Sequence, residues 1–178
     1  MAGQRPVQAP LTKHNDPTRT AATKSVIEAM VEGLNDHQIN GMSAFFHPDF
    51  CWMGNFGCGT KHGLRAFQEN WQRPFQAAFS DKVAIDEARL FDGEWGACFG
   101  AQHATHSGEF MGIAPTGKRV TIRYMDFWQV RDGKIIDNWV MVDFPDVLRQ
   151  LGVDVFNGQG WEIYDRGEAV PPRPNHDK

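Results

Sequence analysis

Hydrophobic residues recur at helical spacing in two parts of the N-terminal half of the chain. Asp16-Pro17 is typical of a helix start, because an N-cap residue is followed by proline at the first helical position. Residues 64–79 have the same helical spacing, with Pro74 as the expected site of a kink. A short helix is predicted over 39–46, since a residue before proline, here at His47-Pro48, disfavours helical backbone. The first helix carries its apolar face at Val26, Ile27, Met30, Val31 and Leu34.

The second half of the chain changes to the composition of β-strands. Segments 82–91, 94–111 and 119–130 are rich in β-branched and aromatic residues and are broken by turn residues. Asp132-Gly133 separates two strand-like runs and predicts a hairpin between 119–130 and 135–142. Helices first and an antiparallel sheet second predict an α+β fold.

The ends of the chain differ from its middle. Residues 1–15 and 166–178 are polar or proline-rich and are expected to form flexible arms around one domain at 16–165. Inside that domain, Asp143 and Gly152 are expected to cap a terminal helix. Residues 156–164 are expected to pack back over the mouth of a pocket, although no clear pattern supports this.

Composition narrows the class of protein and of partner. The net charge is -4 and 41% of residues are hydrophobic, which is typical of a soluble globular chain and argues against nucleic acid or membrane as partner. Three cysteines without paired spacing indicate reduced thiols, and no apolar leader or span is present, so a cytoplasmic protein is expected. No HxH or HExxH spacing occurs, so no metal is predicted.

Several ordered motifs resemble one known family. The turn Gly-Ile-Ala-Pro-Thr-Gly-Lys at 112–118, the Asp-Gly-Lys-Ile hairpin at 132–135 and Leu-Arg-Gln-Leu-Gly at 148–152 are similar to those of SnoaL-like polyketide cyclases. The resemblance covers roughly residues 20–152. It implies the nuclear-transport-factor-2-like cone, in which a curved antiparallel sheet carries helices on its concave face.

The resemblance also implies a chemistry. Such cyclases close polyketide esters by intramolecular aldol condensation without metal or cofactor, using a cavity aspartate and a cavity histidine. Aligned through the Asp-Gly-Lys-Ile turn, the family's aspartate falls on Val140 and its cavity histidine on Asp126. His106 matches a further family histidine. The acid/base groups are therefore expected to have been exchanged, with Asp126 and His106 as the catalytic pair.

Asp126 shares a predicted strand face with Tyr124 and Trp128. Burial among aromatic side chains would raise its pKa toward the range useful for acid/base catalysis, whereas an exposed or salt-bridged Asp126 would be structural. A two-residue hairpin loop would pair Asp126 with Trp139, and a three-residue loop would pair it with Asn138; family geometry favours the second.

Two functions from different classes remain open. One is a cofactor-free cyclase, isomerase or lyase acting on a hydrophobic carbonyl compound; the other is a non-catalytic binding or assembly module of the same fold. We also expect a homodimer through the outer sheet face at Arg123, Met125, Phe127 and Gln129. The residues expected to contact the ligand are Trp52, Phe56, Trp71, Tyr124, Trp128, Asn138, Trp139 and Val140.

Overall fold

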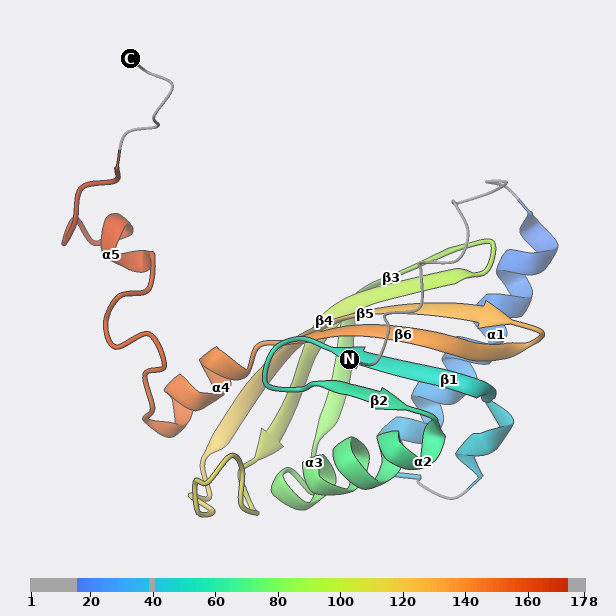
Figure 1. The fold of residues 1–178 in the computed structure, drawn as a ribbon, viewed down its shortest axis with the longest axis horizontal. Helices are drawn as coiled ribbons and strands as arrows, with labels where there is room; N and C mark the ends of the chain where they lie inside the picture. Colours follow the sequence, from blue (N-terminus) through green and yellow to red (C-terminus); the bar gives the residue numbers. More distant parts are fainter. Residues whose placement is uncertain (1–15, 39–40, 173–178) are drawn as a thin grey trace.

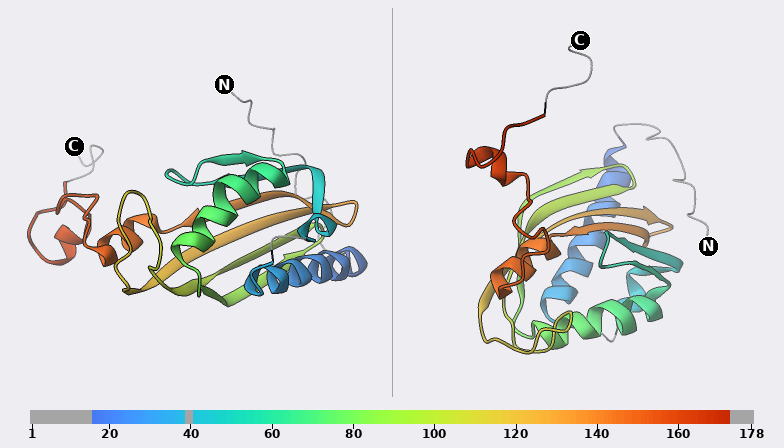
Figure 2. Two further views of the ribbon diagram at one scale, coloured as in Figure 1. Left: turned by 90° about the horizontal axis from the view of Figure 1, so that it is seen from below. Right: turned by 60° about the vertical axis from the view of Figure 1, so that its left-hand side comes forward.

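The computed structural model describes residues 16–38 and 41–172. Within them, six strands form one sheet in the order β2-β1-β6-β5-β4-β3, and each neighbouring pair is antiparallel except β1 and β6, which are parallel. The sheet curves around the helices (Figures 1 and 2), so the α+β prediction is confirmed. The strands are β1 (Phe46–Gly54), β2 (Thr60–His62), β3 (Val83–Asp92), β4 (Trp95–Thr105), β5 (Arg119–Arg131) and β6 (Lys134–Val142).

Helix α1 (Pro17–Asn35) begins where the sequence predicts. The Asp16 carboxylate accepts a hydrogen bond from the Arg19 backbone N–H at 3.0 Å, which satisfies one of the free donors of the first turn. Ile27 is fully buried against the sheet, where a Cβ on Gly96 would lie 2.4 Å from its Cδ1 atom. Glycine at this strand position therefore lets α1 approach β4 closely.

The second helical stretch consists of three short pieces, α2 (Leu64–Phe67), the π-helical turn η2 (Gln68–Gln72) and α3 (Arg73–Ala78). Pro74 lies in the first turn of α3, where its missing N–H costs least. The irregular turn comes directly before the proline, as is common where a helix bends. Residues of α1 and of this stretch line one cavity with residues of the sheet, so both lie on its concave face.

The short helix predicted over 39–46 is wrong in its extent. Residues 39 and 40 lie outside the described part, a 3-10 turn covers only Met42–Ala44, and β1 begins at Phe46. Pro48 therefore lies inside a strand. The pairing of β1 with β6 shifts register between Phe46 and Cys51, and proline is tolerated where a ladder is interrupted.

The β5–β6 hairpin has a register that differs from both predicted ones. Asp132 and Gly133 have φ values of 49° and 71°, which fits a two-residue turn with both central residues left-handed. The register then shifts, because Val130 pairs with Ile135 whereas the preceding Gln129 pairs with Asp137. One residue of β6 is thus bulged out, and Asp126 pairs with Val140 instead of Trp139 or Asn138.

The two segments that follow β4 and β6 differ from the predictions at their far ends. Strand β4 ends at Thr105 and not at 111, and residues 106–118 form a loop with one isolated bridge. Helix α4 (Phe144–Leu151) is capped by Asp143 and by Gly152 as predicted. Beyond it, α5 (Glu162–Asp165) stands away from the body of the molecule (Figures 1 and 2), and Trp161 is 82% exposed. The expected packing of 156–164 over a pocket mouth is therefore wrong.

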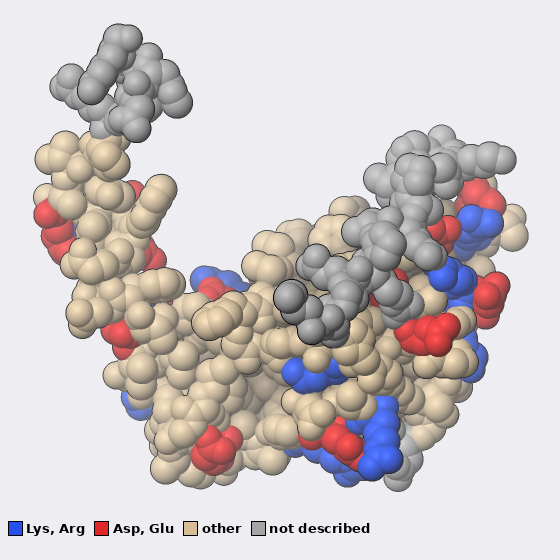
Figure 3. Space-filling view, in the orientation of Figure 1, with Lys and Arg blue, Asp and Glu red and all other residues tan. Residues whose placement is uncertain are grey.

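The surface carries both signs of charge. On the face shown in Figure 3, acidic and basic side chains are interspersed, with most of them toward the end of the molecule where α1 begins. Across the described residues, no helix combines the length and apolar character that crossing a membrane requires.

Candidate active site

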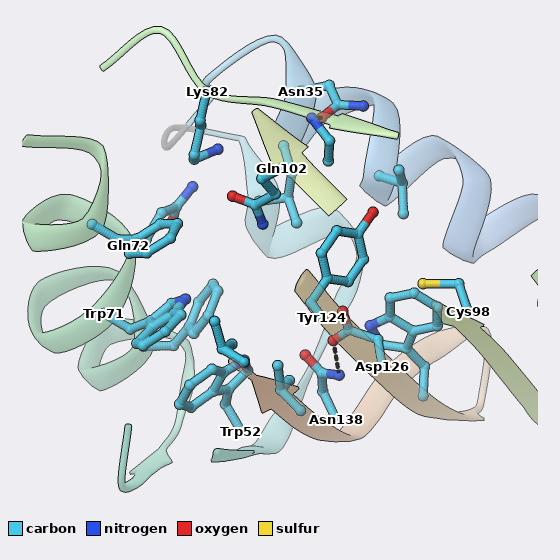
Figure 4. A pocket seen from close by; sticks show the side chains of 18 of the residues that line it. Asn35, Trp52, Trp71, Gln72, Lys82, Cys98, Gln102, Tyr124, Asp126 and Asn138 are labelled. Atoms are coloured by element: carbon cyan, nitrogen blue, oxygen red, sulfur yellow. Dashed lines mark hydrogen bonds between the residues drawn. The ribbon is translucent and has the colours of Figure 1, made fainter. Parts of the chain in front are cut away.

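A cavity of about 120 Å³ opens between the concave face of the sheet and the helices. Figure 4 shows side chains from the helices and from the inner strands converging on it. An apolar cavity of about 150 Å³ binds benzene in another protein, so this volume is near that needed for one ring. The lining residues are Val31, Leu34, Asn35, Trp52, Phe67, Trp71, Gln72, Phe75, Lys82, Ala84, Asp86, Cys98, Gln102, Tyr124, Asp126, Trp128, Asn138, Val140 and Val142.

One wall of the cavity is a stack of aromatic rings. The ring centroids of Trp52 and Trp71 lie 4.4 Å apart, and Trp71 stacks on Phe75 at 5.0 Å with an angle of 11° between the planes. These rings come from β1 and the second helical stretch, so the wall forms only when helix and sheet pack together. Flat rings in this arrangement favour a planar, unsaturated ligand.

Asp126 lies on the sheet side of the cavity with Tyr124 and Trp128, the residues that share its strand face. Its Oδ1 atom accepts a hydrogen bond from Asn138 Nδ2 at 2.9 Å (Figure 4). The pKa of Asp126 is raised to about 7, mainly by burial and to a smaller extent by the nearby Asp86 carboxylate, while the Asn138 hydrogen bond opposes the rise. The carboxyl can therefore both accept and return a proton near neutral pH.

The bulge in β6 creates this arrangement. It places Val140 directly opposite Asp126 and leaves Asn138 as the diagonal neighbour, which a side-chain amide can still reach. Both Asn138 and Val140 line the cavity. Val140, which the resemblance aligns with the family's aspartate, and Asp126 are thus cross-strand partners on the same wall.

The second acid of the cavity, Asp86, is differently placed. It accepts hydrogen bonds from the Tyr124 hydroxyl and from Arg89, whose Nε atom lies 2.7 Å from its Oδ2 atom. Burial raises the pKa of Tyr124 and of Cys98, so both remain protonated at neutral pH. Asp86 is held in an ion pair with Arg89, whereas the hydrogen-bond partner of Asp126 among the described residues is the neutral Asn138. Asp126 is therefore the acid that can exchange a proton with a ligand, and Asp86 is the one held in place by its partners.

His106 does not join Asp126. It is fully buried after the end of β4, between the rings of Phe79 and Phe110, and is not among the residues that line the cavity. Its Nδ1 atom accepts the Thr116 backbone N–H at 3.3 Å and lies 3.0 Å from the Thr116 hydroxyl. The expected pairing with Asp126 is therefore wrong, since the histidine instead fastens the loop that follows β4.

Two of the expected ligand contacts also lie elsewhere. Phe56 is at the tip of the glycine-rich turn between β1 and β2 and is completely exposed. Trp139 alternates with its cavity-lining neighbours, so it points to the outer face, where its ring lies 5.4 Å from that of Trp95. The structure does bring six of the eight to the cavity wall: Trp52, Trp71, Tyr124, Trp128, Asn138 and Val140.

Sequence reasoning missed a group of polar residues at one end of the cavity. Figure 4 shows four of them close together: Lys82, just before β3, Gln102 of β4, Gln72 of η2 and Asn35 at the end of α1. The alternation of Lys82, Ala84 and Asp86 along one strand face could have indicated the lysine and Asp86. No local pattern links the other three.

The acidic, cysteine and histidine residues of the described part do not form a cluster of three or more that could hold a metal ion. All three cysteines are buried as free thiols. Burial raises the pKa of Cys58 to about 11, so that thiol is not a nucleophile at neutral pH.

Comparisons with known proteins agree with the cavity and the fold. The model of the SnoaL-like polyketide cyclase family matches residues 24–151. The nogalonic acid methyl ester cyclase of Streptomyces nogalater is 29% identical over 74% of this chain and 98% of its own length. An aklanonic acid methyl ester cyclase of Streptomyces sp. (strain C5) is 30% identical over 86% of this chain and 93% of its own.

A solved structure confirms the predicted cone. The crystal structure of wild-type IdmH from Streptomyces antibioticus superposes with a TM-score of 0.65 and 28% sequence identity, covering 74% of this chain and 99% of that one. The nuclear-transport-factor-2-like architecture expected from the sequence is therefore confirmed.

Proposed function

The chain belongs to the SnoaL-like polyketide cyclase family, and we propose that it is a cofactor-free acid/base enzyme acting on a planar carbonyl compound. Asp126 is the proposed catalytic residue. The observation that carries this proposal is the position of its carboxyl: it lines the cavity, its one hydrogen-bond partner among the described residues is the neutral Asn138, and burial raises its pKa to about 7.

The proposed reaction begins with proton transfer from carbon to oxygen. The Asp126 carboxylate removes a proton from the carbon next to the substrate carbonyl, and the electron pair of the broken C–H bond moves into an enolate. In a cyclisation, the enolate carbon then attacks a second carbonyl of the same molecule, whose oxygen takes the proton back from Asp126. Return of the proton to a different carbon would give an isomerase, and the reverse of carbon–carbon bond formation would give a lyase.

The cross-strand pairing of Asp126 and Val140 supports this reading of the family resemblance. The resemblance aligns the family's aspartate with Val140, and the carboxylate of this chain stands on the adjacent strand of the same cavity wall. A carboxyl on either strand faces the same space. The acid/base group can therefore change strand while the cavity keeps its chemistry, although the substrate must bind in a different orientation.

Hydrogen–deuterium exchange tests the proposal with a simple probe, acetophenone, whose methyl protons lie next to a carbonyl. The wild-type protein in D₂O is expected to accelerate exchange over buffer, as followed by proton NMR. Asp126→Asn keeps the shape of the side chain and should reduce the acceleration by about 100-fold or more. Cys98→Ser, which alters the strand partner of Asp126 without removing a carboxyl, is the matched control.

Two outcomes of this experiment would contradict the proposal. If Asp126→Asn exchanges as fast as the wild type, the carboxyl is not the base. If the wild type binds acetophenone but exchanges no faster than buffer, the non-catalytic binding module is the better description.

We also propose that the outer sheet face pairs with a second copy of the chain. Phe99, Met125 and Met141 are register partners across β4, β5 and β6 and form a continuous exposed row, with Phe127 beside it. Monomeric proteins rarely expose so continuous an apolar surface, and a twofold axis would cover it on both copies. Gln129, which we expected on this face, is buried and donates to Glu94 at 3.0 Å.

Light scattering after gel filtration measures the oligomeric state. The wild type is expected to be a dimer, and Met125→Asp a monomer. Met111→Asp, on the exposed loop after β4, is the control that should leave the dimer intact. A monomeric wild type would contradict the proposed interface.

A further inference from the structure

Lys82 points into the cavity at the end opposite Asp126. It follows α3 and precedes β3, and its backbone N–H donates to the Phe79 carbonyl at 3.2 Å, which fixes the start of the strand. The side chain is half-buried and extends toward Gln102 and Gln72, as Figure 4 shows. Its ammonium group is therefore part of the cavity and not of the outer surface.

No side chain of the described residues neutralises this lysine. Lys82 is the one lysine or arginine among the residues that line the cavity, and its ammonium group makes no ion pair or hydrogen bond within the described part of the chain. Of the two acids that line the cavity, Asp86 is paired with Arg89, and Asp126 is held by Asn138 at the other end. Burial lowers the pKa of Lys82, which is the response of an ammonium group that has lost water without gaining a counter-ion.

The carboxamides around Lys82 are also incompletely bonded. The Oε1 atoms of Gln72 and Gln102 are buried without a hydrogen-bond partner. Gln72 is held by donation to the Gln38 carbonyl at 2.8 Å, whereas none of the described residues makes such a bond to the side chain of Gln102. Gln102 can therefore turn either its oxygen or its amide group toward a ligand, and buried groups of this kind need a partner from water or ligand.

We propose that Lys82, with Gln102 beside it, binds a carboxylate group of the substrate. This inference rests on the proposed function, because it takes the carbonyl end of the same molecule to lie at Asp126. One ammonium matches one negative charge, and its hydrogen bonds to a carboxylate are of the strong, charge-assisted kind. A phosphate would bring a second negative charge into a cavity whose other ionisable lining groups are acids, at a high desolvation cost.

The aromatic wall connects the two ends. The rings of Trp52, Trp71 and Phe75 line the same cavity as the polar cluster and Asp126. Figure 4 shows Trp71 below Gln72 and Trp52 beside Asn138, the hydrogen-bond partner of Asp126. The substrate is thus a planar keto acid of about one ring, held by its carboxylate at Lys82. The named relatives are cyclases of methyl esters. The ammonium group of Lys82 should make this cavity prefer the free acid instead.

Three probes of one shape test the preference: para-acetylbenzoate, its methyl ester and acetophenone. Titration calorimetry at neutral pH should show the acid binding the wild type about tenfold or more tightly than the ester, as a charged hydrogen bond contributes. Lys82→Met keeps the length of the side chain. It should bind the acid more weakly but the ester as before, so the difference in affinity should disappear. Lys24→Met removes an exposed lysine that pairs with Glu28 on α1, and should change neither affinity.

The result that overturns the inference is equal binding of acid and ester to the wild type, an unchanged preference in Lys82→Met, or no binding of the acid at millimolar concentration. Because the Lys82 ammonium group has no partner among the described residues, Lys82→Met should fold. Thermal unfolding checks this, and Lys82→Gln is a second variant.

Asp126→Asn separates this inference from the proposed function. It should abolish exchange while keeping the preference for the acid. If the preference for the acid over the ester depends on Lys82 but neither the wild type nor any variant catalyses exchange, the carboxylate site stands and the acid/base function fails. If exchange depends on Asp126 but the preference is absent, the reverse holds.

Discussion

Asp126 on β5 is half-buried and His106, just after the end of β4, is fully buried, and their surroundings allow different chemistry. Asp126 opens onto a cavity and has one neutral hydrogen-bond partner. His106 is enclosed by Phe79 and Phe110, and its Nδ1 atom is bonded to Thr116. A titratable group can act on a substrate only where a substrate can reach it, so access to the cavity separates the two.

The enclosed histidine has a structural role in the loop after β4. Its backbone N–H donates to the Lys118 carbonyl at 2.9 Å, and its own carbonyl accepts from Gly117 at 3.0 Å. Because Nδ1 accepts the Thr116 N–H, the ring proton is on Nε2, which is buried without a partner among the described residues. Ring and backbone together close the loop that carries the Pro-Thr-Gly turn.

The largest effect is expected from a second acid beside the accessible one. Val140→Asp places a carboxyl opposite Asp126 in the cavity wall, and two such groups cannot both ionise cheaply. The free energy of unfolding at about pH 8 should fall on the order of 4 kcal/mol. Urea unfolding measures this, and adding Asp126→Asn should restore part of the loss.

Val142→Asp is the matched control for that cycle. Val142 also lines the cavity but pairs with Tyr124. Adding Asp126→Asn should therefore restore less of the unfolding free energy lost in Val142→Asp than of that lost in Val140→Asp. Equal relief in the two backgrounds would mean that the carboxyls at 126 and 140 do not interact. We also expect Val140→Asp alone not to cyclise a linear polyketide ester, because one of the coupled acids stays protonated.

A smaller effect should follow from opening the enclosed site. His106→Ala leaves the Thr116 N–H without its acceptor and an empty space between two rings, for a loss of about 3 kcal/mol in unfolding free energy. Exchange per folded molecule should stay within about threefold of wild type, since the ring does not contact the cavity. Loss of exchange in a folded His106→Ala protein would restore the histidine as a participant in the chemistry.

His103→Ala serves as its control, because this histidine lies near the end of β4, three residues before His106, but is exposed, with Nδ1 3.2 Å from the Thr121 hydroxyl. Its unfolding free energy should change by less than about 0.5 kcal/mol. A similar loss of unfolding free energy in the two variants would show that the enclosed position of His106 does not add to stability.

The smallest expected effect is a pH dependence that belongs to Asp126. Its pKa is raised from 3.8 to about 7 in the folded protein, so the folded state binds more protons than the unfolded state between these values. Stability contributed by the protonated carboxyl is complete below about pH 4 and is lost as the pH rises through 7. Because each pH unit inside this interval changes the stability by about 1.4 kcal/mol, the loss between about pH 5.5 and 7 should be on the order of 2 kcal/mol.

Urea unfolding of wild type and Asp126→Asn at a series of pH values isolates this contribution. As the pH rises, the free energy of unfolding of the variant should increase relative to that of the wild type, and this difference should level off above about pH 8. A constant difference across the series would show that the carboxyl titrates normally and is not desolvated.

The sequence alone determined those features that rest on neighbouring residues. The Asp16 cap, the Asp143 and Gly152 caps of α4 and the Asp132-Gly133 turn each depend on contacts within a few positions, and each is present in the structure. Alternation also placed Asp126 with Tyr124 and Trp128 on the cavity face. Ordered motifs were enough to identify the family, since they reflect the same turns.

Only the tertiary structure decided how the site is assembled. The bulge in β6 set Asp126 against Val140, although the two-residue turn by itself predicts Trp139. Packing between helix and sheet brought Lys82 to the far end of the cavity and enclosed His106 away from it. These positions depend on many weak contacts between residues far apart in the chain, and no local pattern in the sequence encodes their sum.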